Sequence, residues 1–147
     1  MSEQVVLKLI IAWFLMAVCV VLHVAGLMVA FRWVNRRAAR LEGSAWLATW
    51  MLIRLAGWTI LLHLVQIGVW ACFYAWKKGM PDLDSALYFS AVTYTTTGYG
   101  DLVLPQPWRM FGAIEALTGI LMCGLSTGFF FAVLNSFFGA RFRAEPS

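Results

Sequence analysis

Seven consecutive residues, Thr95 to Asp101, have the types that allow a backbone to bind a cation. Their sequence is Thr-Thr-Thr-Gly-Tyr-Gly-Asp, which suits neither a strand nor a helix. Gly98 and Gly100 adopt a positive φ without steric cost, and alternating such glycines with ordinary residues turns successive carbonyl groups to one side. A column of carbonyl oxygens can replace the water shell of a dehydrated cation. We therefore expect this stretch to line an ion path.

The segments around this stretch are strongly apolar. The chain has 147 residues, of which 62% are hydrophobic and 12% are charged. A soluble domain of this size could not bury so much apolar surface, and apolar runs of about 18 residues or more are typical of transmembrane helices. Irregular backbone at membrane depth is tolerated only where it lines a water-filled path or is buried in protein. The alternative is a strained re-entrant loop that conducts nothing, although such strain persists chiefly at functional sites.

We predict an all-α membrane protein with three transmembrane helices, over residues 5–31, 55–76 and 108–136. The first run is too long for a signal peptide, and no small-residue cleavage site follows it. Residues 45–54 can begin as an interfacial helix before the chain enters the bilayer. A further helix over residues 84–95, capped by Asp82 or Asp84, is too short to span and should enter the membrane part-way.

Arginine residues beside the predicted spans indicate the topology. Clustered arginines in short loops mark the cytoplasmic side of a membrane. They lie in the first loop and after the third span: Arg32, Arg36, Arg37, Arg40, Arg141 and Arg143. We therefore expect a multi-pass protein of the cell (inner) membrane, with its N-terminus outside and its C-terminus in the cytoplasm. The net charge of +4 follows from this topology and does not indicate nucleic-acid binding, and a lipid-headgroup site is an alternative use of the arginines.

The segment from Thr96 to Asp101 resembles the potassium-channel signature sequence. Potassium-channel filters are the standard example of ion selection by backbone carbonyls. The resemblance covers residues 55–136. It includes a pore-helix pattern and several positions of the last helix: Ala86, Leu87, Tyr88, Phe89, Ser90, Thr93, Glu115, Gly119, Gly124, Thr127 and Gly128. It implies a pore domain over residues 45–140, preceded by an extra helix and an Arg-rich loop over residues 1–44.

The resemblance also implies which groups bind the ion. Potassium ions would be held by the backbone carbonyls of Thr96, Thr97, Gly98 and Tyr99, with Gly100 completing the filter and the Thr96 hydroxyl at its inner mouth. No organic cofactor is implied. Four copies of such a stretch are needed to surround an ion, and the chain has one. A cyclic homotetramer embedded in membrane lipid is therefore expected.

Four residues of the last predicted helix form a single stripe because they are spaced by four: Cys123, Thr127, Phe131 and Asn135. The resemblance places part of this stripe on a water-filled cavity and gate below the filter. The alternative is a helix–helix core, since small residues and asparagine also serve packing. Gly119, Gly124 and Gly128 are candidates for a hinge or for close helix packing.

Several polar residues within the apolar segments need partners, because unpaired polar groups are costly in lipid. For Glu115 we favour a structural bond behind the filter over direct ion contact. For His23 we favour a hydrogen bond to a neighbouring helix over proton sensing. His63, Gln66 and Trp70 share one helical face, and we favour packing over gating for that face.

The chain departs from the family pattern at two positions. Thr97 stands where the family usually has an aliphatic residue, and Val92 occupies a position that is glutamate in some bacterial members. Since Val92 cannot hydrogen-bond to Asp101, we predict that the hydroxyl of Tyr88 does so, in preference to Thr93. Tyr88, Asp101 and Glu115 are thus the candidate supports of the filter.

Two further function classes remain open beside a potassium-selective channel. One is a membrane partner that does not conduct, and the other is a subunit of a potassium transport complex. Catalysis is not expected, because the two histidines and seven carboxylates form no arrangement typical of an enzyme.

Overall fold

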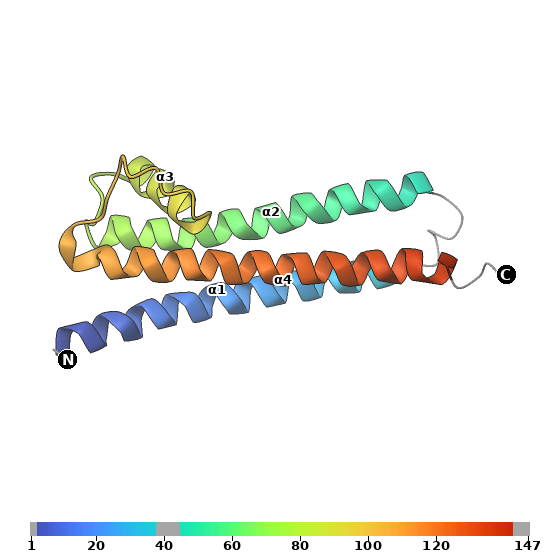
Figure 1. The fold of residues 1–147 in the computed structure, drawn as a ribbon, viewed down its shortest axis with the longest axis horizontal. Helices are drawn as coiled ribbons and strands as arrows, with labels where there is room; N and C mark the ends of the chain where they lie inside the picture. The colour runs from blue at the N-terminus through green and yellow to red at the C-terminus, as the bar shows by residue number, and fades with distance from the viewer. Residues whose placement is uncertain (1–2, 38–44, 143–147) are drawn as a thin grey trace.

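The computed structural model describes residues 3–37 and 45–142, with side chains described as far as residue 136. This part of the chain folds into four α-helices and one 3-10 turn and contains no strand, as expected for the all-α class. The elements are α1 (Glu3–Asn35), α2 (Ala45–Trp76), α3 (Leu83–Tyr94), η2 (Gln106–Trp108) and α4 (Arg109–Phe142). In Figure 1, α1, α2 and α4 run lengthwise beside one another, and the short α3 packs at one end.

Three of the helices are long and apolar enough to cross a membrane: Glu3–Asn35, Trp46–Trp76 and Gln106–Ser136. The protein is therefore a multi-pass membrane protein. The helices extend beyond the predicted apolar runs, because backbone hydrogen bonding continues through the polar residues that flank a span. Residues 45–54 belong to the same helix as residues 55–76, so no separate interfacial segment precedes the second span.

The first and last helices begin and end at opposite ends of the bundle. α1 begins at the end that carries α3, and α4 ends at the far end (Figure 1). The start of α1 therefore lies at the same end of the bundle as the loop that follows α3. The Arg-rich loop is described only up to Arg37; Arg40 and Arg143 lie outside the described residues.

The N-terminus of α3 is fixed by Asp82, which decides between the two predicted caps. The backbone N–H of Ser85 donates to Oδ1 of Asp82 at 2.7 Å, while Asp84 lies within the first turn. A carboxylate here satisfies a free backbone donor and suits the positive end of the helix. Asp82 thus defines where the chain turns from the connection after α2 into α3.

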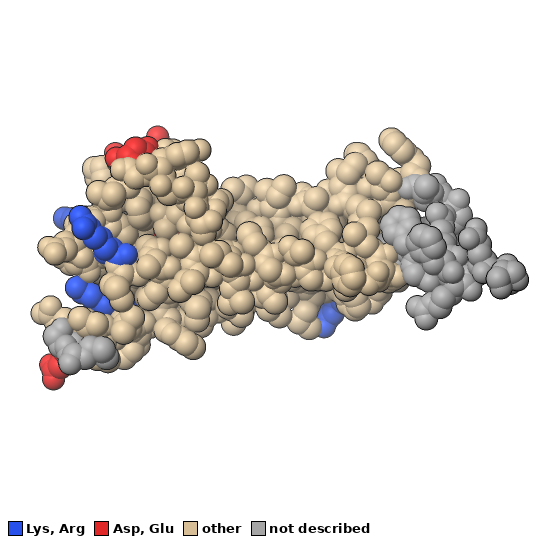
Figure 2. Space-filling view, in the orientation of Figure 1, with Lys and Arg blue, Asp and Glu red and all other residues tan. Residues whose placement is uncertain are grey.

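The core is densest at the end of the bundle that carries α3. Large aromatic side chains from α2, α3 and α4 are buried there, including Trp70, Tyr74, Phe89 and Phe111. The rings of Phe73 and Phe111 stack at 4.9 Å between centroids, which ties α2 to α4. Most of the charged side chains visible in Figure 2 also gather at this end, and one further basic patch shows on the lower edge towards the other end. This packing gives the loop that follows α3 a rigid base.

Candidate functional site

The backbone from Thr96 to Gly100 alternates in its conformation. Positive φ angles occur at Thr96 (58°), Gly98 (52°) and Gly100 (79°), which is every second residue. The sequence predicted a positive φ at the two glycines. In the structure the alternation begins two residues before Gly98, at Thr96. A non-glycine residue in this region costs about 1–2 kcal/mol, so Thr96 is strained. Strain of this kind is typical of functional sites.

The start of the loop is tied to the last turn of α3 by hydrogen bonds. The backbone N–H groups of Thr97 and Gly98 both donate to the carbonyl of Val92, at 2.9 and 3.1 Å. The hydroxyls of Thr95 and Thr97 lie 2.9 Å apart. Val92 therefore supports the loop through its backbone oxygen, a role that its apolar side chain gives no reason to predict.

The outer end of the loop is held by the predicted pair. The Tyr88 hydroxyl donates to Oδ2 of Asp101 at 2.7 Å, and both residues are exposed within the chain. This hydrogen bond stabilises the ionised carboxylate, so it holds the pKa of Asp101 below its ordinary value. The predicted hydrogen bond of Asp101 is confirmed, with Tyr88 rather than Thr93 as the donor.

Replacing Tyr88 with phenylalanine should change how long an open filter persists while leaving its ion preference unchanged. Without the phenol, the pKa of Asp101 returns towards its ordinary value, so Asp101 becomes protonated at a higher pH than in the parent. Any acid-induced change in open time should therefore begin at a higher pH. Single-channel open times in planar bilayers, recorded over a pH series, measure this. If Tyr88→Phe matches the parent while Asp101→Asn does not, Asp101 acts through another group.

Glu115 is buried behind α3 and joins three helices. Its side chain is fully buried. One carboxyl oxygen accepts from the Tyr74 hydroxyl of α2 at 2.7 Å, and the other contacts Oγ of Ser90 in α3. Oγ of Ser90 also lies 2.9 Å from the carbonyl of Ile67. The preference for a structural bond over ion contact agrees with this position.

The number of protons in this cluster indicates that Glu115 is neutral. Ser90 has one hydroxyl proton but lies within hydrogen-bond distance of two oxygens, those of Glu115 and Ile67. Two separate two-centre hydrogen bonds form here if the carboxyl group donates to Ser90 and Ser90 donates to Ile67; with an ionised carboxylate, the single Ser90 proton would have to be shared between both oxygens. Tyr74 then donates to the remaining carboxyl oxygen. A neutral acid also avoids the cost of an unpaired charge at membrane depth.

If Glu115 is neutral, glutamine and leucine at this position should have different effects on stability. Glu115→Gln supplies one donor and one acceptor in the same places, so we expect the thermal unfolding midpoint to stay close to that of the parent. Glu115→Leu leaves the Tyr74 hydroxyl without a partner and should cost about 1–3 kcal/mol. Thermal unfolding of the purified protein in detergent compares the two variants. Equal destabilisation by both would contradict a neutral Glu115.

A second polar cluster connects α1 to the end of α3. Five side chains form a closed chain of hydrogen bonds: His23 of α1, Ser126 of α4, His63 and Gln66 of α2, and Tyr94 of α3. The distances between successive partners are 2.8 to 3.1 Å. The expected bonding of His23 to neighbouring helices is confirmed. We call this cluster the polar ring.

The direction of the donors around the polar ring is fixed by a sixth contact. The amide nitrogen of Gln66 donates to the backbone oxygen of Leu62 at 3.2 Å, so the nitrogen, not the oxygen, faces His23. His23 therefore accepts at Nδ1 and donates from Nε2. Ser126 accepts from His23 and therefore donates to Nε2 of His63. His63 in turn donates from Nδ1 to the Tyr94 hydroxyl. Each link has one donor and one acceptor when both histidines are neutral.

Removing the Tyr94 hydroxyl should open the polar ring. Tyr94→Phe leaves the Nδ1–H of His63 and the side-chain oxygen of Gln66 without partners, which should cost about 1–3 kcal/mol. Tyr88→Phe is the matched control, because it removes a phenol from an exposed site on the same helix. Thermal unfolding should separate the two variants. A Tyr94→Phe midpoint equal to that of the control would show that the ring does not stabilise the fold.

Gly119 allows α4 to approach the end of α3. An added Cβ at this position would lie 1.9 Å from the backbone oxygen of Tyr94. Of the two roles considered for this glycine, close packing is therefore the one that the structure supports. By contrast, a Cβ at Gly124 or Gly128 would meet no atom within 4 Å, so these two glycines pack against nothing in the described part of the chain.

The predicted stripe on α4 faces away from the core of its own chain. Cys123, Thr127, Phe131 and Asn135 are all exposed, and the exposed fraction of Phe131 is 65%. The alternative that this stripe forms a helix–helix core is therefore wrong within a single chain. The stripe is available to a cavity or to another subunit.

Four hydroxyl residues that complete the two clusters were not predicted as hydrogen-bond partners, although Ser90 was named in the pore-helix pattern: Tyr74, Ser90, Tyr94 and Ser126. A signal was available, since polar side chains inside apolar helices need partners. Their partners could not be chosen from the sequence because they lie on other helices, up to 103 positions away in the case of His23 and Ser126.

Comparison with known proteins identifies the family. A family model described as "Ion channel" matches residues 47–136. Protein LctB of Bacillus caldotenax is 32% identical over 85 residues, which are 54% of this chain and 63% of that protein, so the match spans less than two thirds of the relative's length. No solved structure matches the chain. Since the family model covers more than half of the sequence, including most of α2 and all of α3 and the loop, the chain belongs to the ion channel family.

Proposed function

We propose that the protein is a potassium-selective channel whose filter is the loop from Thr96 to Gly100. The observation that carries this proposal is the positive φ at every second residue of a Thr-Thr-Gly-Tyr-Gly sequence. Such alternation suits a column of backbone carbonyls. Carbonyls of Thr96, Thr97, Gly98 and Tyr99 would replace the hydration shell of K⁺, which loses its water more easily than Na⁺ does.

The short length of α3 and the charge at its C-terminus support this role. Its 12 residues rise by about 18 Å, well short of the roughly 30 Å of a bilayer core. We propose that α3 enters the membrane part-way, as a pore helix, and that the chain returns through the filter. The C-terminus of α3 carries about half a negative charge, and it leads directly into the loop. A cation near the start of the filter would be stabilised by it.

Four copies of the chain would form the pore. The loop leaves space for neighbours: a Cβ at Gly98 or Gly100 would meet no atom within 4 Å, and Tyr99 is 72% exposed. The exposed stripe that includes Thr127 and Phe131 would then line the cavity below the filter. Pore-forming residues 45–140 contain the whole matched segment, 47–136. Native mass spectrometry should give the mass of a homotetramer.

The extra helix α1 would hold the base of the filter. His23 is connected through the polar ring to Tyr94, whose next residue, Thr95, begins the loop. No other link between α1 and the loop is needed for this role. A shift of α1 would therefore disturb the residue that anchors the filter.

We propose that the N-terminus and the filter face the outside of the cell membrane. Arg36 and Arg37, which follow α1, lie at the opposite end from the filter, which fits a cytoplasmic loop. Ala38→Cys tests this with a membrane-impermeant thiol reagent. We expect no labelling from outside intact cells and full labelling after permeabilisation; labelling from outside would reverse the orientation.

Ion flux from purified protein in liposomes separates a channel from a non-conducting partner. We expect K⁺-driven flux that barium blocks, with no other protein present. Protein that is correctly assembled and inserted but passes no ions would favour the role of a partner in another complex.

A further inference from the structure

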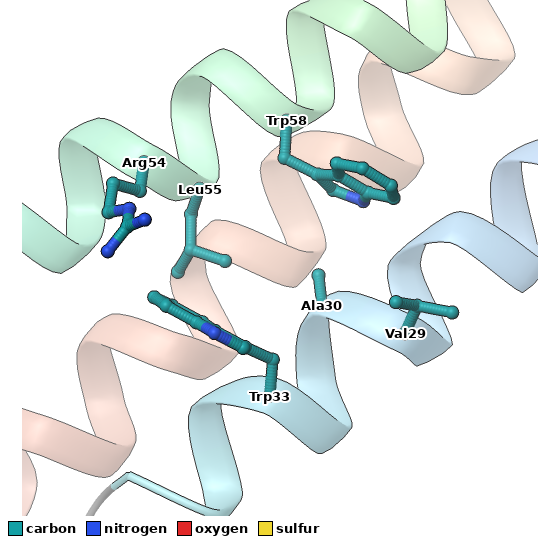
Figure 3. A pocket seen from close by; sticks show the side chains of 6 residues that line it. All are labelled: Val29, Ala30, Trp33, Arg54, Leu55 and Trp58. Carbon is teal, nitrogen blue, oxygen red and sulfur yellow. The ribbon is translucent and has the colours of Figure 1, made fainter.

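A groove of about 190 Å³ lies between α1 and α2, towards the end opposite the filter. Figure 3 shows its walls: Val29, Ala30 and Trp33 come from α1, and Arg54, Leu55 and Trp58 come from α2. The groove is apolar except for the guanidinium group of Arg54, which lies near the indole of Trp33. It thus combines an apolar slot with one charged wall.

Among the described residues, the arginines at this groove contact an aromatic ring and no carboxylate. The guanidinium carbons of Arg37 and Arg54 lie 4.7 and 5.6 Å from the centroid of the Trp33 ring. Such cation–π contacts position a guanidinium without neutralising it. The carboxylates of the described residues belong to other regions: Glu3, Asp82, Asp84, Asp101 and Glu115 lie in the half of the molecule nearer the filter. Among the residues described, both arginines are thus available to an external anion.

Exposed tryptophans near the groove mark where the membrane–water interface is expected. Tryptophan is enriched where a membrane meets water. Trp46 and Trp50, which follow the start of α2, are 76% and 53% exposed, and Trp33 lies two residues before the end of α1. The indole N–H of Trp58 donates to the carbonyl of Gly26 at 3.0 Å, which holds this side chain against α1. Arg54 is therefore within reach of the headgroup layer.

We propose that this groove binds a phospholipid with an anionic headgroup. Arg37 and Arg54 would take the phosphate, since a guanidinium binds phosphate oxygens with two parallel hydrogen bonds. One acyl chain would lie along Val29, Ala30 and Leu55. The apolar walls favour a lipid over free phosphate, because the groove lies on two membrane-spanning helices where only a lipid brings hydrocarbon and phosphate together. This proposal does not depend on conduction.

The experiment is a titration of the purified protein with lipid, followed by native mass spectrometry. The probes are phosphatidylglycerol, phosphatidylcholine with the same acyl chains, and inorganic phosphate. A headgroup contact by one arginine contributes about 1 kcal/mol, which is about a fivefold change in affinity. We expect Arg54→Gln to weaken phosphatidylglycerol binding about fivefold, and Arg37→Gln with Arg54→Gln to weaken it by more.

Arg32→Gln is the matched control, because it removes the same charge from the last turns of α1 without lining the groove. It should leave the affinity within about twofold of the parent value if the site is specific. Equal losses in Arg32→Gln and Arg54→Gln would show general surface attraction and overturn the site. Equal binding of phosphatidylcholine, or saturation of the site by inorganic phosphate with no lipid bound, would also overturn it. Thermal unfolding of each variant confirms that it is folded.

Discussion

Gly119→Ala should prevent α3 from docking on α4 and abolish ion flux. The added Cβ would lie 1.9 Å from the backbone oxygen of Tyr94, and neither main chain can move without moving a helix. Overpacking costs about 1–3 kcal/mol when side chains can adjust, and a collision with backbone should reach or exceed that range. Tyr94 also belongs to the polar ring, so a displaced α3 would lose those hydrogen bonds as well. Size-exclusion chromatography and thermal unfolding in detergent measure the loss of assembled protein.

Gly57→Ala is the matched control for this substitution. It places the same methyl group inside α2, where no atom lies within 4 Å. Alanine is also the better helix former, so this variant should be as stable as the parent or slightly more so. A Gly119→Ala protein that assembles, unfolds and conducts like Gly57→Ala would show that α3 and α4 are not packed as described.

Gly98→Ala should abolish or severely degrade selective flux while leaving the helices folded. The φ of Gly98 is +52°, and a residue with a Cβ pays about 1–2 kcal/mol there. In a tetramer the cost is paid in each subunit, so it would total about 4–8 kcal/mol for one filter. No neighbour lies within 4 Å of the new Cβ, so the expected loss comes from backbone strain and not from crowding. Flux of K⁺, Rb⁺, Na⁺ and Li⁺ from liposomes measures it.

Gly98→Ala and Gly119→Ala should differ in their effect on the stability of the helices. The helices should stay folded and the unfolding midpoint should fall much less than in Gly119→Ala, because the loop lies outside the core and can relax without moving a helix. Selectivity that survives in this variant would count against a carbonyl filter that needs a positive φ at this position.

The spans and the loop could be predicted from the sequence because local features determine them. Apolar runs longer than the membrane thickness predict the three long helices, and paired glycines predict the positive φ at Gly98 and Gly100. Tyr88 and Asp101 could be paired because the short α3 and the loop bring nearby parts of the chain together. Helix ends were less accurate: α1 begins at Glu3 and ends at Asn35, since composition marks the membrane and not the last backbone hydrogen bond.

The partners of the buried polar groups could not be predicted, because they depend on how the helices rotate against one another. His23 needed a partner in any arrangement, but only the packing of α1 on α2 and α4 places Gln66 and Ser126 beside it. The same holds for Glu115 and its contacts with Tyr74 and Ser90. The positive φ at Thr96 was also missed, since threonine has no intrinsic preference for that region.

The reversal potential of the purified protein in a planar bilayer tests the proposed potassium filter most directly. With K⁺ on one side and Na⁺ on the other, at equal concentrations, a carbonyl filter passes K⁺ and excludes Na⁺. The current should therefore reverse only at a large voltage, negative on the side that contains K⁺, and barium should block it. A current that reverses near zero millivolts would mean that the loop from Thr96 to Gly100 does not select potassium, and it would contradict the proposed function.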